Sequence, residues 1–328
     1  MTVPLTARVL PAGADAIAEA VRVLKAGGLV AFPTETVYGL GADAGNGQAV
    51  ARLYAAKGRP AFNPLIAHVS APSAARKLAR FDAAAEQLAA AFWPGPLTLV
   101  LPKAADCPVA ELATAGLDSI AVRVPTHPVA QDILRSFKGA LVAPSANRSG
   151  HVSPTTAAHV LADLGGRIDL VVDGGATQLG IESTIVACLG APVLLRPGGV
   201  PRQAIERVLQ QKLREAPDIG AASDAPRAPG MLASHYAPRT PLRLDVKRLE
   251  PGEALLAFGP SLAAGAERAA KVLNLSARGD LSEAAANLFS HLRALDAAGA
   301  RAIAAMPIPR EGLGEAINDR LRRAAAPR

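Results

Sequence analysis

Short apolar runs alternate with amphipathic segments along the first two thirds of the chain. Leu29 to Phe32 has the length and composition of a buried strand, whereas residues 14–26 have apolar side chains at helical spacing and end at a glycine pair. Other strand-like runs are 65–69, 97–101, 120–124, 141–143, 168–172, 184–187 and 193–195, with helices expected near 73–80 and 82–92. This alternation predicts a three-layer α/β domain over residues 1–214.

The stretch 27–63 places polar residues directly after the first buried strand. Pro33 ends that strand, and the hydroxyl and carboxyl side chains of residues 34–38 follow, with glycines and then a helix that ends at Lys57-Gly58-Arg59. Open α/β sheets bind ligands beyond the carboxyl ends of their strands. Lys57 and Arg59 can project to one side of their turn and form an anion site. Cations also occur at helix ends simply because they complement the helix dipole, so that interpretation stays open on these residues alone.

Further polar residues follow other predicted strands. Arg123 points off the strand 120–124, and a buried arginine requires an anion. Ser145 and Asn147 follow the strand 141–143, and Arg196 lies at the end of the strand that begins at Val193. This inventory suits the positioning and charge neutralisation of a phosphate ester.

Two residues also have structural explanations. Ser153 precedes Pro154, which predicts a helix N-cap with proline at the first helical position. His68 lies within the predicted strand 65–69, where a lone histidine is more often packed and hydrogen-bonded than catalytic.

Residues 215–240 are rich in Pro, Ala, Gly and Ser and predict a linker. Met231, His235 and Tyr236 are unusual in a spacer, so we expect this segment to lie over the site as a lid. From residue 241 to 328 the βα pattern resumes and predicts a second, smaller α/β domain. Asp280 and Glu283 have capping-box spacing before a helix with a leucine stripe.

Composition narrows the class of partner. The 328 residues carry a net charge of +7, which suits nucleotide or RNA. Arg320, Arg322 and Arg323 cluster near the end, where a solvated helix explains them equally well. No apolar run approaches the roughly 18 residues of a membrane span, and no signal peptide is evident, so we expect a cytoplasmic protein without a membrane partner. Cys107 and Cys188 form no CxxC motif, which disfavours a zinc site.

Several motifs occur together in one order. They are PTETVYGLG, Lys57-Gly58-Arg59 with Asn63-Pro64-Leu65, WPGPLT, AVRVP, PSAN, VSPT, GIESTIV and LLRPG, followed by GMLASHYAP and ANLFSHLRALD. With them the chain resembles the YrdC-type L-threonylcarbamoyladenylate synthases in their long, two-domain form. The resemblance implies a YrdC-like twisted open sheet covered by helices, plus a Rossmann-like C-terminal domain.

The implied reaction joins L-threonine, bicarbonate and ATP into L-threonylcarbamoyl-AMP and releases pyrophosphate. The product supplies downstream machinery that modifies tRNA, and a weak contact with tRNA itself is compatible with the basic charge. The resemblance assigns catalysis to Lys57 and Arg59. It assigns ATP binding to Lys57, Arg59, Asn63, Ser119, Ser145, Asn147, Ser153, Arg196 and Tyr236. It assigns threonine binding to Thr36, His68, Arg123, Ala143 and Ser183. Mg²⁺ is expected with ATP, without metal ligands from protein side chains.

Two alternative functions remain on sequence grounds. The same fold resembles the carbamoyl-adenylate-forming module of hydrogenase-maturation proteins, but those carry CxxC zinc motifs that this chain lacks. A non-enzymatic RNA-binding module would explain the charge, although it would not need a threonine-sized pocket. Dependence of ATP turnover on L-threonine separates these alternatives.

Overall fold

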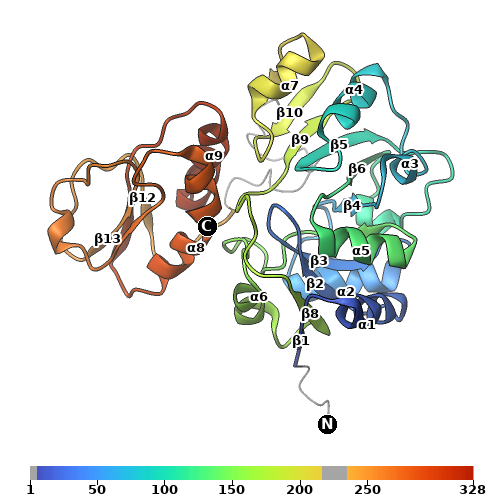
Figure 1. Cartoon of the computed structure of the whole chain (residues 1–328), viewed down its shortest axis with the longest axis horizontal. Coiled ribbons are helices and arrows are strands. Elements are labelled where there is room, and N and C mark those ends of the chain that lie inside the picture. Colours follow the sequence, from blue (N-terminus) through green and yellow to red (C-terminus); the bar gives the residue numbers. More distant parts are fainter. Residues whose placement is uncertain (1–5, 216–234, 328) are drawn as a thin grey trace.

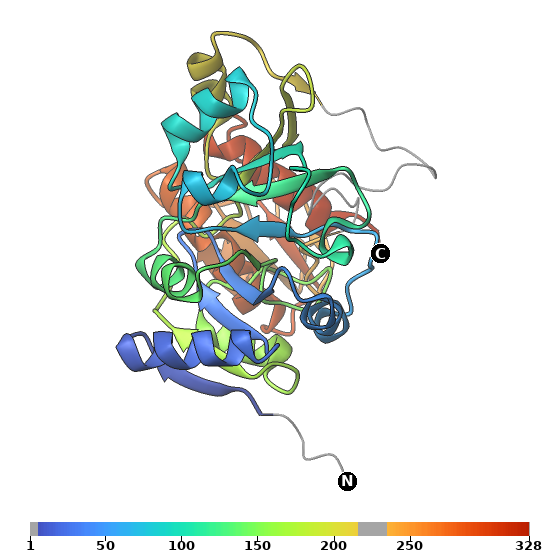
Figure 2. The same ribbon diagram turned by 90° about the vertical axis from the view of Figure 1, so that its right-hand side faces the viewer.

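The computed structural model describes residues 6–215 and 235–327. An 11-stranded sheet organises the N-terminal lobe (residues 6–215), and a four-stranded sheet organises the C-terminal lobe (residues 242–327), as Figure 1 shows. Helices cover both sheets, so the predicted α/β class and the smaller second α/β unit are confirmed. Helices α1 and α7 lie at opposite ends of the N-terminal lobe (Figures 1 and 2).

The large sheet mixes parallel and antiparallel pairs in the order β1-β8-β2-β3-β7-β4-β6-β5-β9-β10-β11. Its strands are β1 (Arg8–Pro11), β2 (Val30–Pro33), β3 (Tyr38–Asp43), β4 (Ile66–His68), β5 (Leu97–Pro102), β6 (Ser119–Arg123), β7 (Leu141–Val142), β8 (Leu170–Asp173), β9 (Thr184–Ala187), β10 (Val193–Arg196) and β11 (Arg214–Glu215). Its helices are α1 (Ala14–Lys25), α2 (Gly47–Lys57), α3 (Pro72–Ala75), α4 (Ala83–Phe92), α5 (Pro128–Phe137), α6 (Ala157–Leu164) and α7 (Arg202–Leu209).

Alternation along β2 divides the core between two helical layers. Val30 and Phe32 pack with α1 and α5, whereas Leu29 and Ala31 belong to the cluster that includes α2, α4, α6 and α7. A third cluster, around Ile66 and Ala121, consists of strand residues from β4, β5, β6, β9 and β10. The site described below lies beside this third cluster.

The connection after β2 differs from the prediction. The chain does not pass from β2 through a glycine loop into a helix; it turns back at residues 34–37 into β3, which pairs antiparallel with β2. Gly41 lies inside β3, where a Cβ atom would come within 2.6 Å of the Phe32 ring. The glycines therefore allow close packing within the hairpin, and α2 begins only at Gly47.

The predicted N-cap at Ser153 is wrong. Helix α6 begins at Ala157, and Thr156 is its N-cap, accepting a hydrogen bond from the His159 N–H. The Pro154 carbonyl accepts from the Tyr38 N–H and the Thr155 carbonyl from the Thr177 N–H, so tertiary contacts hold this segment extended. The Ser153 hydroxyl is thereby released for a different contact, described below.

In the C-terminal lobe all strand pairs are parallel, in the order β12-β15-β13-β14. The strands are β12 (Leu242–Arg243), β13 (Glu253–Ala257), β14 (Val272–Asn274) and β15 (Ala302–Ala305), and the helices are α8 (Leu281–Asp296) and α9 (Leu313–Ala325). Asp280 caps α8 as predicted, accepting from the N–H groups of Ser282 and Glu283. The box is not closed, because the Glu283 carboxylate accepts from the Ser276 hydroxyl and the Asp280 N–H donates to that same hydroxyl.

Helices α8 and α9 join the two lobes. They face the N-terminal lobe in Figure 1, and their apolar residues form one cluster with Val37, Val152 and Ile181. Arg293 of α8 pairs with Asp163 at 2.7 Å, and Glu315 of α9 pairs with Arg202 at 2.6 Å. The interface is therefore both apolar and ionic.

Candidate active site

A cavity of about 470 Å³, partly open to solvent, lies where the β2–β3 turn meets the ends of β4 and β6. The chain segments 143–145 and 182–183, the end of β10 and residues 235–236 complete its wall. The lining residues are Thr36, Val37, Arg59, Ile66, His68, Arg123, Ala143, Pro144, Ser145, Glu182, Ser183, Arg196, His235 and Tyr236.

The structure brings most of the predicted site residues together. Nine of them line the cavity: Thr36, Arg59, His68, Arg123, Ala143, Ser145, Ser183, Arg196 and Tyr236. Lys57, Asn63, Asn147 and Ser153 do not line the cavity but are buried. Ser119 lies on β6, four residues before Arg123, and does not line the cavity.

Lys57 and Arg59 are buried cations that contact backbone carbonyls. The Lys57 ammonium donates to the carbonyls of Ser145 and Asn147, both at 2.5 Å, and Arg59 donates to those of Asn63 and Pro64 at 3.1 and 2.9 Å. Within residues 6–215 and 235–327, neither cation forms an ion pair with a carboxylate. Burial lowers the pKa of Lys57 well below its usual value, with a further contribution from Arg59. Burial also lowers the pKa of Arg59 to about 10. An anion bound beside these two cations would raise both pKa values again.

Three buried side chains near these cations have polar atoms without partners among the described residues. They are both amide atoms of Asn63, Nδ1 of His235 and the hydroxyl of Tyr236. Buried polar atoms normally form hydrogen bonds, because leaving them unsatisfied costs about 1–3 kcal/mol each. Two of these side chains, His235 and Tyr236, line the cavity, which indicates a polar ligand.

The opposite wall combines Arg123 with a carboxylate that sequence reasoning did not assign to the site. Arg123 donates to Glu35 Oε1 at 2.7 Å, and both side chains are about 95% buried. Burial alone would raise the pKa of Glu35, but the Arg123 guanidinium holds it below its usual value. Glu35 belongs to the motif PTETVYGLG. The run of polar residues after β2 was therefore the sequence feature that could have identified it as a site residue.

His68 is neutral at physiological pH. Burial, reinforced by the Arg123 charge, lowers the pKa of His68 to about 3. Its Nδ1 lies 3.1 Å from the Ile66 carbonyl, which can only accept, so Nδ1 carries the proton. Nε2 is therefore an acceptor.

Hydroxyls and amides form three further small networks. The Ser183 hydroxyl lies 2.8 Å from that of Thr98 and 3.3 Å from a nitrogen of Arg196. The Ser145 hydroxyl donates to the Asn147 side chain at 2.6 Å. Thr36 lies 2.8 Å from the Thr34 hydroxyl. These bonds fix the rotamers of the lining hydroxyls before any ligand binds.

The C-terminal lobe reaches this site through Arg320. The side chain is fully buried, and it pairs with Glu182 at 2.8 Å and with Asp319 at 2.6 Å. Its guanidinium lies over the Tyr236 ring, 5.1 Å from the centroid, and Glu182 accepts the Ser153 hydroxyl at 2.5 Å. Arg320 is thus not part of a solvated cluster, and no local pattern distinguishes it from Arg322, which is exposed.

The predicted lid segment lies mostly outside the described residues, and so does Met231. Its end is described: His235 packs edge-on against Tyr236, which stacks on Phe289 of α8 at 5.5 Å. Tyr236 has a left-handed φ of 62°, a strained conformation for a tyrosine, which its ring contacts with His235, Phe289 and Arg320 stabilise.

Family models match nearly the whole chain. Residues 22–198 match a model described as "Telomere recombination", and residues 200–326 match "Threonylcarbamoyl-AMP synthase, C-terminal domain". The threonylcarbamoyl-AMP synthase of Pyrococcus abyssi is 43% identical over 321 residues, covering 92% of each chain. That of Bacillus subtilis is 41% identical over 325 residues, covering 95% of this chain and 93% of its own.

A solved structure, P. abyssi Sua5 complexed with L-threonine, matches with a TM-score of 0.87 and 38% identity, covering 99% of this chain and 98% of the other. Both lobes are therefore shared with a protein of known structure. The chain belongs to the threonylcarbamoyl-AMP synthase family.

Proposed function

We propose that this protein synthesises L-threonylcarbamoyl-AMP from L-threonine, bicarbonate and ATP, with release of pyrophosphate. The observation that carries the proposal is the pair of desolvated cations, Lys57 and Arg59, that form no ion pair with a described carboxylate. Anionic phosphates beside these cations would replace the interactions with water that the cations lose on burial. Family membership and the threonine complex of the P. abyssi relative support the same reaction.

ATP would occupy the side of the cavity that holds Arg59, Arg196 and Tyr236. The side-chain amide of Asn63 and the hydroxyl of Tyr236 would form hydrogen bonds with ATP. Neither group has a hydrogen-bond partner among the described residues. Ser145, Asn147 and Ser153 shape this wall through the contacts given above, and Lys57 holds the carbonyls of residues 145 and 147 in place. Ser119 would serve only a ligand that extends along β6.

L-threonine would occupy the side that holds Thr36, His68, Arg123 and Ser183. Its carboxylate suits Arg123, whose Nη1 makes no hydrogen bond to a described residue. Neutral Nε2 of His68 can accept from the threonine hydroxyl or amine. The backbone at Ala143 closes this side.

The chemistry is the attack of a threonine carbamate oxygen on the α-phosphorus, with pyrophosphate leaving from the opposite side. Two anions must approach each other, so the buried cations lower the barrier by neutralising charge in place. Mg²⁺, when bound with ATP, would neutralise part of the phosphate charge. Among the described residues no group of three or more His, Cys, Asp or Glu is placed to hold a metal, and Glu35 and Glu182 are already paired with arginines. Oxygen ligands would therefore come from phosphate and water.

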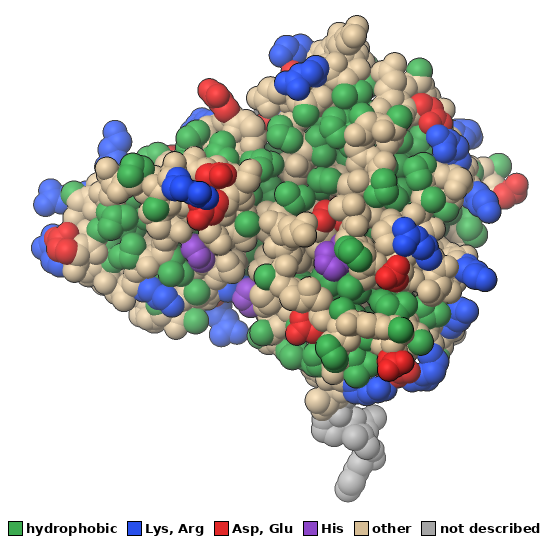
Figure 3. Space-filling model, viewed as in Figure 1, with side chains coloured by type: hydrophobic (Ala, Val, Ile, Leu, Met, Phe, Trp, Pro, Cys, Tyr) green, Lys and Arg blue, Asp and Glu red, His purple; other side chains and the backbone are tan. Residues whose placement is uncertain are grey.

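We also infer that the product passes to tRNA-modifying machinery in the cytoplasm, because a mixed anhydride must be consumed before water hydrolyses it. No helix of the described residues is long and apolar enough to cross a bilayer. On the face shown in Figure 3, basic side chains are scattered among acidic ones, which gives no support to an extended RNA-binding surface.

Pyrophosphate release tests the proposal. With ATP and bicarbonate present, L-threonine should start the release and omission of threonine should abolish it. Tight RNA binding together with threonine-independent ATP turnover would instead favour one of the alternative modules.

A further inference from the structure

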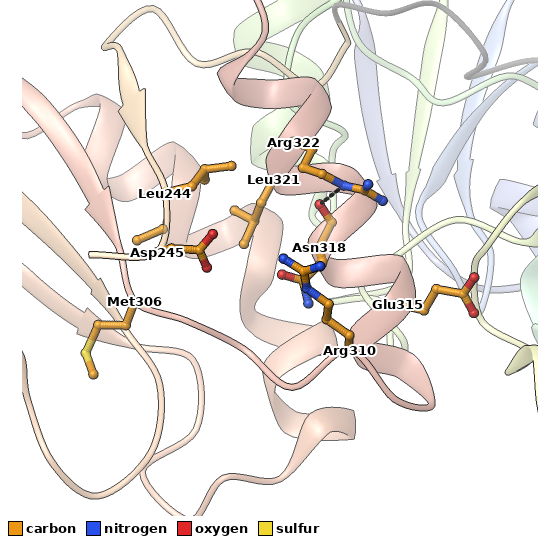
Figure 4. A pocket seen from close by; sticks show the side chains of 9 residues that line it. Leu244, Asp245, Met306, Arg310, Glu315, Asn318, Leu321 and Arg322 are labelled. Atoms are coloured by element: carbon orange, nitrogen blue, oxygen red, sulfur yellow. Dashed lines mark hydrogen bonds between the residues drawn. The ribbon is translucent and has the colours of Figure 1, made fainter. Parts of the chain in front are cut away.

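A second hollow lies in the C-terminal lobe, at the carboxyl edge of its parallel sheet. Its empty volume, which includes space open to solvent, is about 540 Å³. It is lined by Leu244, Asp245, Ala305, Met306, Arg310, Glu315, Asn318, Leu321 and Arg322. Figure 4 shows Leu244, Asp245 and Met306 on the strand side and the other labelled residues on the side of α9. Nothing in the proposed synthase reaction uses this hollow.

The hollow lies where neighbouring connections leave the sheet in opposite directions. After β12 the chain packs Val246 and Leu249 on one face, in a cluster with Ala304. After β15 it enters α9, whose Ile317 packs on the other face with Ile303. Open parallel sheets bind ligands at such a switch point, because the two diverging connections leave a crevice.

The charge of the hollow favours an anion. Within the described parts of the chain, Arg310 and Arg322 form no ion pair, and both are exposed. Glu315 is neutralised by Arg202, so two free cations against one free carboxylate, Asp245, leave a net charge of 2 − 1 = +1. Guanidinium groups match the geometry of phosphate oxygens.

The loop that carries Arg310 is fixed before any ligand arrives. The Asn318 side-chain amide donates to the carbonyls of Ile308, Pro309 and Gly314 at 3.1, 3.2 and 2.8 Å. Asp245, which lines the hollow, has a left-handed φ of 54°, a conformation that aspartate tolerates better than most residues. Preorganised loops are typical of binding sites.

We propose that this hollow binds a nucleoside monophosphate. The phosphate would lie between Arg310 and Arg322, Asp245 would accept a hydrogen bond from a sugar hydroxyl, and Leu244, Met306 and Leu321 would cover the base. An acidic residue after a strand of a parallel sheet has this ribose-binding role in dinucleotide sites. This hollow is separate from the ATP side of the active-site cavity. The proposal therefore does not depend on the proposed synthase activity.

Hydrogen–deuterium exchange on the full-length chain tests the assignment. AMP should slow exchange across residues 306–322, and adenosine at the same concentration should not. Arg310→Glu and Arg322→Glu should each raise the half-saturating AMP concentration for this segment by at least about tenfold, because each loses a charge-assisted contact. Arg301→Glu is the matched control: Arg301 is exposed, lies just before β15 at the opposite sheet edge, and pairs only on the surface with Glu250.

Three results would overturn the proposal. One is the absence of protection in this segment. Another is protection with the same half-saturation in Arg310→Glu as in the unmodified chain, which would mean transmission from the active site. The third is equal protection by inorganic phosphate, which would remove the nucleoside part from the assignment.

Discussion

At the scale of single residues, this site is defined by polar groups held in place without their natural partners. Lys57 and Arg59 contact carbonyls, and Asn63, His235 and Tyr236 have polar atoms that no described residue satisfies. Burying such groups without partners lowers the stability of the free protein. A phosphorylated ligand would give each group a hydrogen-bond or ionic partner and so remove that cost. We therefore expect ligands to stabilise the protein strongly.

Replacement of Arg59 tests this directly. Arg59→Ala should weaken ATP binding or turnover by about 10- to 100-fold, since a charge-assisted hydrogen bond contributes roughly 1.5–3 kcal/mol. The control is Arg52→Ala on α2, which removes an exposed pair with Asp169 and a long hydrogen bond to the Gly27 carbonyl, both away from the cavity. Titration calorimetry with ATP measures the difference, and equal affinity in both variants would refute the phosphate role.

The buried neutral state of His68 predicts a pH dependence of stability. Its pKa is about 3 in the folded chain and near 6.5 when unfolded, so the unfolded chain binds more protons between these values. The free energy of unfolding should therefore fall as pH drops below 6.5, and from pH 7.5 to 5 this histidine should contribute about 2 kcal/mol to the loss. Denaturation of His68→Gln at both pH values should show that much less pH dependence. An unchanged slope would contradict the neutral assignment.

At the scale of elements, α9 links the second lobe to the first. Most strands and helices follow from apolar periodicity, as at α1 and β9, because their signal is local. The start of α6 and the burial of Arg320 depend on contacts with segments far away in sequence, such as Tyr38 and Glu182. Local patterns carry no information on such partners, although the unusual composition of residues 215–240 and the family resemblance both pointed to Tyr236.

Arg320 is a positioning residue that orients Glu182 and Tyr236. Arg320→Met should destabilise the protein by about 3–5 kcal/mol, because it leaves Glu182 as a buried, unpaired charge. Adding Glu182→Gln should restore much of that stability while turnover stays low, since the Tyr236 ring still lacks the cation beneath it. Thermal unfolding and pyrophosphate release separate the two effects. If turnover recovers together with stability, the role of Arg320 is structural only.

At the scale of the whole molecule, residues of the second lobe contact Tyr236, which lines the cavity of the first. The sequence predicted two α/β units and a connecting segment, but it could not predict that α8 and α9 complete the wall around Tyr236. That packing depends on surfaces of complementary shape, such as Gly180 against α8. The periodicity of apolar residues in the sequence does not predict whether two surfaces are complementary. Here a Cβ atom on Gly180 would come within 2.5 Å of the Ala285 carbonyl oxygen.

Substitution of Gly180 tests the coupling of the lobes. Gly180→Ala should displace α8, and with it Phe289, one turn beyond Ala285, on which Tyr236 stacks. Part of the cost is backbone strain, because Gly180 has a φ of 69°, and that part is about 1–2 kcal/mol for an L-residue. Gly116→Ala is the matched control, with a φ of 73° and open space around its Cβ position. Both variants should therefore lower the melting temperature, but only Gly180→Ala should reduce threonine-dependent pyrophosphate release and raise KM for ATP. Equal turnover in the two variants would show that the second lobe does not shape the site.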